Sequence, residues 1–357
     1  LLPTAGRGRI GKDVRSMATR ADGSLWMGFG AEGLARLDLT TGEVTALRPA
    51  PTALPRSRAQ AVAAMDNGDV WVGYTRGLYR VDGATGRVSP FALLDNANIM
   101  ELRNEPPWLW AGGTMGLMRI DPRNGQAITY RHTPGKRSGL SDNSVLSLLP
   151  TGDGRLWVGT QRGLNLFDIQ TETFRRILQD PNDPASLPND VINALLKDRS
   201  GRLWVATANG IGILNATIDG KPRFLHLTTA HGLPHGTVTV LLEDTQGMVW
   251  AGTGDGLAII NPRTLAIRSL GPADGAGIRT TWAGSGARLP DGTLLFGGLG
   301  GLTVVQPDRL KEWTFHPPVA ITAAKVGDSA VALPLPPTGL VVQPDDRGLE
   351  VTFAALD

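Results

Sequence analysis

The stretch Gly154–Leu164, GRLWVGTQRGL, contains the pattern that decides the fold. A glycine turn comes first, and the short apolar segment 156–158 and then Gly159 follow it. A polar link leads to Gly163 and to a second apolar segment, which ends near Asp168. Short apolar runs bounded by glycine turns are typical of β-strands, so this stretch predicts an antiparallel hairpin.

The same pattern recurs along the chain in seven copies. The residue that follows its Trp-x pair is Gly28, Gly73, Gly112, Gly159, Ala206, Gly252 and Gly297 in turn. Successive copies are therefore 39 to 47 residues apart. This period, with about four short strands in each copy, is typical of propeller blades. The sequence predicts an all-β fold that begins with a seven-bladed β-propeller.

Six of the nine tryptophans occupy one position of the repeat, and Leu295 takes that position in the last copy. A tryptophan repeated once per blade indicates packing between blades, since each ring buries about 150–250 Å². We therefore expect Trp157, Trp204 and Trp250 to be largely buried and to make no ligand contact. The glycine after each tryptophan suits a close approach of the next blade.

A second element precedes the first strand of several blades and occupies residues 139–145, 186–191 and 232–238. Together the two elements resemble the two-component regulator propeller repeat, and the resemblance covers roughly residues 13–307. Two tail segments, 316–322 and 349–357, resemble the opening of the immunoglobulin-like YYY domain that follows such propellers. The expected domains are a propeller over 1–310, and then a linker and the incomplete start of a β-sandwich over 311–357.

The last blade has three recognisable strands, Trp282–Leu289, Thr293–Phe296 and Leu302–Val305. A ring needs a latch to remove its sheet edges. Because the segment before Asp13 is not needed elsewhere, we expect it to pair with this blade as the outer strand.

Composition excludes several classes of function. The 35 basic and 33 acidic residues nearly cancel, and they form no basic tract of the kind that binds nucleic acid. The absence of cysteine excludes disulfides, thiolate metal sites and a cysteine nucleophile, and it fits an exported bacterial protein. No apolar run approaches the ~20 residues of a membrane span. Since the chain does not begin with Met, we expect any export signal and membrane anchor to lie outside it.

The resemblance implies a place in a larger receptor. Proteins with this arrangement are membrane-anchored bacterial sensors, and many carry two propellers in tandem. Propeller and sandwich lie in the periplasm, and the output is a histidine kinase, a diguanylate cyclase or a hybrid. We therefore expect a periplasmic, non-enzymatic sensing module that binds a small molecule or oligosaccharide, needs no cofactor and belongs to a homodimeric, inner-membrane-anchored receptor.

Two other classes of function stay open. The first is a scaffold that binds a partner protein. The second is a metal-dependent lyase, because the repeat is faintly similar to streptogramin-lyase propellers. His231 and His235 are four residues apart, but Gly232 and Pro234 between them disfavour the helix that would make this a metal-binding spacing. We predict no metal ligand and no catalytic residue.

The candidate ligand-binding residues lie in loops at one end of the propeller. Because strands alternate in direction, the link after the Trp-x-Gly segment and the element before the first strand should open on the same face. Binding residues concentrate in loops on a rigid scaffold. The polar candidates there are Tyr74, Arg76, Arg162, Asn209, His235 and Asp255. Arg76 and Arg162 suit a carboxylate or sulfate, and no aromatic platform is evident in these loops.

Overall fold

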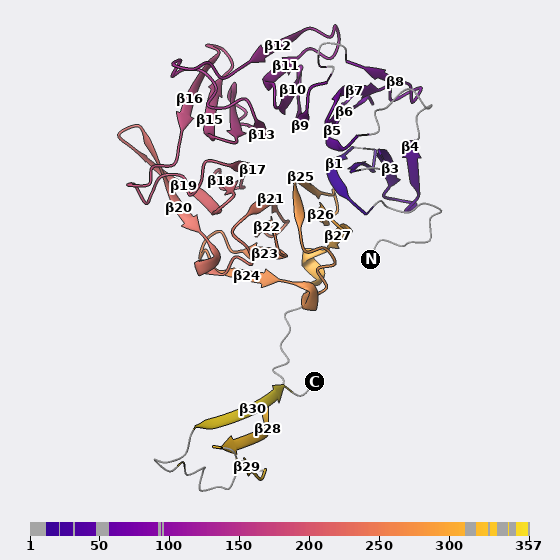
Figure 1. The fold of residues 1–357 in the computed structure, drawn as a ribbon. Coiled ribbons are helices and arrows are strands. Elements are labelled where there is room, and N and C mark those ends of the chain that lie inside the picture. Colours follow the sequence, from indigo (N-terminus) through magenta and orange to yellow (C-terminus); the bar gives the residue numbers. More distant parts are fainter. Residues whose placement is uncertain are drawn as a thin grey trace. The chain divides into compact units, whose positions relative to one another are not determined.

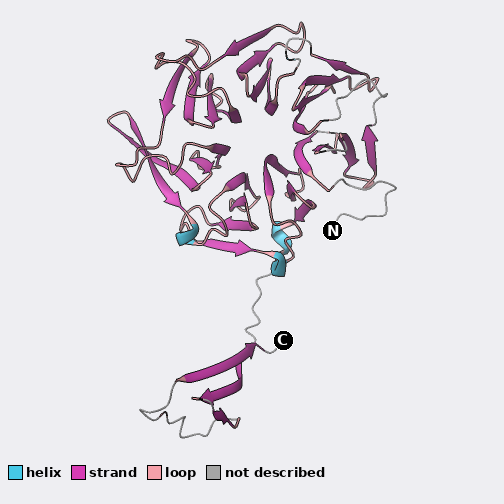
Figure 2. Cartoon of the chain, viewed as in Figure 1, coloured by secondary structure: helices cyan, strands magenta, loops and turns pink. Residues whose placement is uncertain are grey.

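Antiparallel β-sheets dominate the computed structural model, which describes residues 12–20, 22–30, 33–47, 57–91, 94, 96–310, 319–327, 329–333, 342 and 348–355. The chain divides into two compact units, Leu1–Pro307 and Asp308–Asp357. Figure 2 shows the strands in magenta and short 3-10 helices in cyan. These helices are η2 (Thr229–His231), η3 (Pro272–Asp274) and η4 (Pro307–Arg309). The predicted all-β class is confirmed.

The first unit contains seven sheets within its described part. The first three sheets consist of β1 (Val14–Thr19), β2 (Ser24–Phe29), β3 (Leu34–Asp38) and β4 (Val44–Leu47); β5 (Ala59–Ala64), β6 (Val70–Tyr74), β7 (Gly77–Val81) and β8 (Val88–Pro90); and β9 (Ile99–Glu105), β10 (Trp108–Gly113), β11 (Gly116–Ile120) and β12 (Ala127–Tyr130). The next three consist of β13 (Val145–Pro150), β14 (Arg155–Thr160), β15 (Gly163–Asp168) and β16 (Thr173–Ile177); β17 (Ile192–Lys197), β18 (Leu203–Thr207), β19 (Gly210–Ile218) and β20 (Lys221–Leu227); and β21 (Val238–Glu243), β22 (Val249–Thr253), β23 (Leu257–Ile260) and β24 (Ile267–Leu270). The seventh consists of β25 (Thr281–Arg288), β26 (Leu294–Gly298) and β27 (Gly301–Val305).

These sheets form a ring, and the first strand of each faces its centre (Figure 1). Neighbouring first strands contact one another around the ring, and β1 contacts both β5 and β25. At the closing point the Gly300 N–H donates to the Lys12 carbonyl at 2.7 Å. The indole of Trp282 also donates to Asp13 at 2.7 Å. The first and last sheets therefore close the ring through direct hydrogen bonds.

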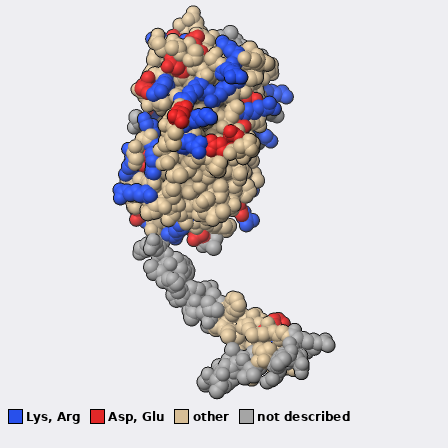
Figure 3. All heavy atoms as spheres, turned by 90° about the vertical axis from the view of Figure 1, so that its left-hand side faces the viewer, with Lys and Arg blue, Asp and Glu red and all other residues tan. Residues whose placement is uncertain are grey.

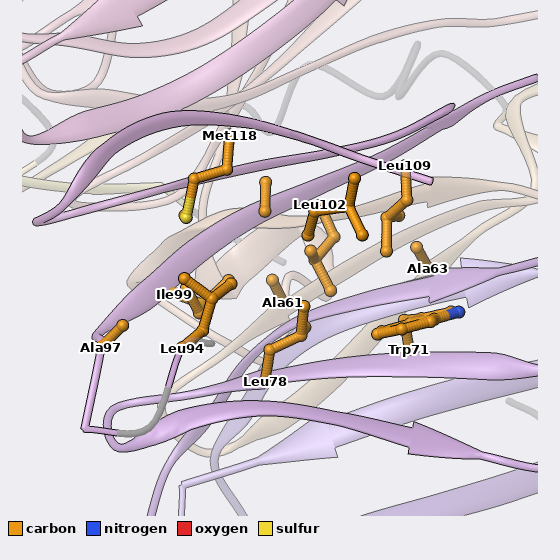
Figure 4. Packing of buried hydrophobic residues seen from close by; sticks show 12 residues of the cluster. Ala61, Ala63, Trp71, Leu78, Leu94, Ala97, Ile99, Leu102, Leu109 and Met118 are labelled. Carbon is orange, nitrogen blue, oxygen red and sulfur yellow. The ribbon is translucent and has the colours of Figure 1, made fainter. Parts of the chain in front are cut away.

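Glycine allows adjacent sheets to pack closely, as the sequence predicts. A Cβ atom on Gly159 would lie 2.7 Å from a side-chain carbon of Ile192 in the next sheet. At the closing point, a Cβ on Gly297 would lie 2.8 Å from Val14. Larger side chains fill the remaining space between sheets, such as Trp71 and Leu102 in the cluster between the second and third sheets (Figure 4). The glycine position of the repeat thus determines how closely neighbouring sheets approach.

The tryptophan position is buried in most sheets. Trp204 and Trp250 are 0% and 1% exposed, which confirms their predicted burial. Trp157 is less enclosed and only partly buried, although it packs against the apolar cluster between the fourth and fifth sheets. Its ring borders a cavity of about 420 Å³ beside β19. Thr151 stands six residues before it, where the two buried rings have an aspartate that binds the indole N–H.

The seventh sheet has the three strands that the sequence predicts, with bounds shifted by a few residues. The proposed latch falls on residues 1–12, of which 1–11 lie outside the described part, so the outer strand stays a prediction. In the second unit, β28 (Val319–Val326) pairs with β29 (Ser329–Val331) on one side and β30 (Leu349–Ala355) on the other. The predicted sandwich segment 316–318 also lies outside the described residues.

Candidate functional site

The two sets of loops meet on one face of the ring, as the strand directions predict. The Gly163 N–H, in the turn after β14, donates to the Asp190 carbonyl just before the next sheet at 2.7 Å. The same bond joins Gly210 to Gly236 at 2.6 Å. We call this face the loop face. Hydrogen bonds between neighbouring sheets hold the backbone of the loop face, so its side chains project from a rigid backbone.

Tyr74 does not belong to the loop face. Its side chain is 0% exposed, and its ring packs edge-on against Tyr79 with centroids 5.5 Å apart. Burial raises the pKa of its phenol, and the hydroxyl has no hydrogen-bond partner among the described residues. Tyr74 was predicted to be an exposed ligand-binding residue, and its burial corrects this prediction.

The repeat itself contains the signal that explains the burial of Tyr74. Three sheets have a buried threonine at its position, and each hydroxyl donates to the carbonyl of the turn glycine at 2.8 Å; these are Thr160, Thr207 and Thr253. The position is therefore a structural one at the end of the second strand. Tyr74 fills it without making the turn bond.

Arg76, Arg162, Asn209 and Asp255 occupy equivalent places on the loop face. Each directly precedes the turn glycine, whose φ is 114°, 110°, 90° and 96° respectively. These left-handed values favour glycine. All four side chains are exposed. Arg162 lies 3.8 Å from Asp142, so its charge is already partly balanced.

Three of the predicted residues form one row on the loop face. The Asn209 amide oxygen lies 3.7 Å from the place of a Cβ on Gly236, next to His235. The His235 ring lies against Gly254, beside Asp255, and its Nδ1 accepts from the Thr237 N–H at 2.9 Å. We call Asn209, His235 and Asp255 the polar row.

Arg279 extends the polar row and was not predicted. Its Nε lies 3.3 Å from Asp255 Oδ1, and both side chains are exposed. Arg279 stands in the segment that leads into the seventh sheet, where the repeat element is too eroded to be recognised. In the structure, the Gly256 N–H donates to the Arg279 carbonyl at 2.6 Å. Arg279 therefore occupies the position that Asp190 and Gly236 occupy before the preceding sheets.

A cavity of about 470 Å³ lies among the first strands of the seven sheets. Its charged lining consists of Glu101, Arg103 and Arg288, and Gln60, Asn104 and Asn193 add amide groups. None of the six residues predicted from sequence lines it. Sequence reasoning missed these residues because they lie within strands of ordinary alternation, and only the ring brings them together.

Glu101 is the most enclosed charge of this cavity, at 9% exposure. Burial raises the pKa of its carboxyl, although Arg103 opposes the rise. The Arg103 Nη2 donates to Glu101 Oε1 at 3.1 Å and to the Leu148 carbonyl at 3.2 Å. The other carboxylate oxygen, Oε2, lies 3.5 Å from the place of a Cβ on Gly284 of β25. No described residue makes a hydrogen bond to it.

An aromatic side chain, Trp282, stands at the start of β25. The Arg15 guanidinium lies 4.3 Å from the centroid of Trp282 and bonds Asp13 at 2.9 Å. Trp282 is half-buried and does not line the cavity. The cluster joins the first and last sheets.

The outer surface carries both signs of charge. On the side that Figure 3 shows, Lys and Arg are interspersed with Asp and Glu. Among the ion pairs, Arg223 Nη1 lies 2.5 Å from Asp183 Oδ2. The described residues contain no group of three potential metal ligands. They also contain no helix that is long and apolar enough to span a membrane.

Three segments of the chain match the model of the two component regulator propeller, residues 139–162, 186–209 and 232–255. Each begins at the element that precedes a first strand and ends just before the turn glycine. In these segments the chain is similar to that repeat. A search of curated proteins found no match.

Solved structures share the fold. The extracellular domain of a protein described as a hybrid two component system, BT3049 from B. thetaiotaomicron, matches with a TM-score of 0.73 and 20% identity over 90% of this chain. The match covers 44% of that structure, so the chain spans less than half its length. Virginiamycin B lyase from Staphylococcus aureus matches at TM-score 0.61 and 15% identity, over 82% of this chain and 94% of the lyase.

A third match is the β-propeller domain of Cps50 (Swd1) from Myceliophteria thermophila. Its TM-score is 0.58 and its identity 16%, over 84% of this chain and 98% of that one. At such identities the matches show a shared fold, a propeller-like ring of antiparallel sheets. They do not carry an activity from one chain to another.

Proposed function

We propose that this chain is the ligand-sensing region of a bacterial signal-transduction receptor. The observation that carries the proposal is the polar cavity inside a closed ring, with the buried Glu101 and its ion-pair partner Arg103 at its wall. A concave site with a few convergent polar groups is the usual form of a small-molecule site. The similarity to two component regulator propeller repeats, and to the extracellular domain of a two component system, supports sensing as its purpose.

The proposed architecture rests on the sequence repeats and on the sheets of the two units. The seven sheets are the blades of a seven-bladed propeller over residues 1–310, and residues 1–12 supply its missing outer strand. The sheet of β28, β29 and β30 is the start of a YYY-type, immunoglobulin-like sandwich within residues 311–357. The ring closes on its own hydrogen bonds, so we assign ligand binding to the propeller.

The proposed setting is the periplasm, in a homodimeric receptor that is anchored in the inner membrane. The output is a histidine kinase, a diguanylate cyclase or a hybrid of the two-component type. The extracellular origin of the BT3049 domain supports this location. The proposed role is binding without turnover, because the propeller repeats and the first structural match are those of regulatory proteins.

The loop face is proposed as a second contact area for a ligand that is larger than the cavity. Arg76, Arg162, Asn209, His235 and Asp255 are its candidates, and Arg279 joins them. Reversing the charge of Arg76 and Arg162 together tests this area in the full receptor. A lost or weakened response is expected, and an unchanged response with the fold intact excludes these two arginines.

The function is tested by thermal unfolding of the purified chain with soluble glycans, amino acids and oligopeptides. A rise in Tm with one ligand, and a changed output of the full receptor with the same ligand, is the expected result. Turnover of a ligand would favour a lyase instead. If no ligand raises Tm and a partner protein binds, the chain is a scaffold.

A further inference from the structure

Glu101 stands at a position where the first strands otherwise have uncharged residues. The ladders place it opposite Gly112, as Ser16 stands opposite Gly28 and Ser147 opposite Gly159. The other residues that correspond to it are Ala61, Ala194, Val240 and Ser285. Small residues suit the site, because the next sheet approaches closely. Packing between sheets therefore does not explain why this position is a glutamate.

The folded ring does not gain stability from ionised Glu101. Burial raises the pKa of its carboxyl even though Arg103 is bonded to it, so the fold favours the neutral form more than the unfolded chain does. The Arg103 side chain is 46% exposed, so water weakens its attraction for Glu101. A carboxyl that lines a cavity and has a raised pKa is a functional candidate.

Strand β25, which approaches the Glu101 carboxylate at Gly284, has an irregular register there. Between Thr281 and Gly286, four residues of β25 face the single residue Gly297 of β26. In β1 only two residues, Arg15 and Ser16, face Gly28. The two additional residues bring Gly284, with a φ of 75°, next to Glu101 Oε2. Bulges that redirect a strand in this way are common next to binding sites.

Two charged side chains of opposite sign in the cavity, Glu101 and Arg288, could bind a ligand. Glu101 Oε2 has no hydrogen-bond donor among the described residues. Arg288, at the far end of β25, lines the same cavity and has no acidic partner in the described part of the chain. Its Nη1 donates to the Glu243 carbonyl at 3.2 Å. Because strand residues rise about 3.3 Å each, the two groups lie at different depths of the cavity.

We propose that the central cavity binds a short zwitterionic peptide, with its ammonium group on Glu101 and its carboxylate on Arg288. This inference rests on the proposed sensing function and names the class of ligand. An ammonium supplies the donors that Oε2 lacks, and a guanidinium suits a carboxylate. A cavity of about 470 Å³ admits a ligand of this size. Arg103 donates to Oε1 and to the Leu148 carbonyl, so it leaves Oε2 without a donor.

The experiment uses the full chain and a set of simple dipeptides and tripeptides, with the twenty amino acids as shorter comparison compounds, and calorimetry follows a thermal-unfolding screen. We expect at least one free zwitterion to bind, and its N-acetyl and C-amide derivatives to bind at least about tenfold more weakly. Glu101→Gln should remove the preference for the free amine. Arg288→Gln should remove the preference for the free carboxylate.

Glu172→Gln is the matched control, since Glu172 also pairs with an arginine, Arg119 at 3.2 Å, but lies outside the cavity. It should bind the zwitterion like the unaltered chain. The proposal is overturned if none of these compounds binds, or if Glu101→Gln, folded by circular dichroism, binds the free and acetylated forms as the unaltered chain does. Binding of an uncharged glycan that is independent of Glu101 would overturn the zwitterion and leave the sensing function intact.

Discussion

The indole Nε1 of Trp204 donates a hydrogen bond of 2.9 Å to the carboxylate of Asp198, six residues before it. Trp250 repeats the bond with Asp244 at 2.8 Å. Trp157 has Thr151 at the corresponding place and is half-buried. The same tryptophan position therefore exists in at least two environments, which differ in how well the ring is enclosed.

The first prediction compares two of these tryptophans. Trp204→Ala should lower the free energy of unfolding by about 3–5 kcal/mol, because it empties a fully buried site between sheets. Trp157→Ala should cost less, about 1–2 kcal/mol, since part of its ring already contacts water. Chemical denaturation of the two variants measures the difference. Equal losses would mean that exposure of Trp157 does not reflect its packing energy.

The second prediction concerns Asp198. Burial alone would raise the pKa of its carboxyl, but hydrogen bonds from Trp204 and Arg202 outweigh it, and the pKa is lowered from 3.8. A lowered pKa adds stability above the unfolded-state value and loses it as pH falls through the folded-state value. Asp198→Asn should therefore be less stable by about 1–3 kcal/mol at pH 7. The difference should shrink below pH 3.8, as unfolding curves across the acid range will show.

The third prediction concerns Tyr74. Its hydroxyl is buried without a partner, so Tyr74→Phe should leave stability unchanged or raise it by up to about 1 kcal/mol. Ligand binding should be unaffected, because the ring lies between sheets. A loss of binding in a stable Tyr74→Phe variant would show that the Tyr74 hydroxyl takes part in ligand binding. Thermal unfolding and calorimetry on the same sample decide the matter.

The fourth prediction concerns Glu101→Gln and stability. The pKa of this carboxyl is raised above 4.5, so ionisation destabilises the fold as pH rises through the folded-state value. The variant should have a higher Tm than the unaltered chain at pH 7, and the gap should close near pH 4.5. A lower Tm of the variant at pH 7 would mean that the ion pair of Glu101 with Arg103 stabilises the ring.

The repeat made much of the fold predictable, while the cavity was not. Leu-Trp-x-Gly and its spacing predict the paired strands because turn glycines and short apolar runs are local signals. The residues around Glu101 carry no such signal, since their meeting depends on the ladder register of several sheets. Arg279 was missed because its repeat element is eroded. Tyr74 was misplaced because the alternation of a short strand does not tell a buried end from an exposed one.

Asp13 and Trp282, which bond across the closing point, are 269 residues apart in the chain. Each sheet is made of local hairpins and can form as soon as its own strands are synthesised, but the ring closes only after Trp282 has emerged. Contacts between distant parts of a chain slow folding, because the intervening loop must lose entropy before they form. An open arc of sheets should therefore form before the closed ring. Until that last step the central cavity has no complete wall, so ligand binding reports the end of folding.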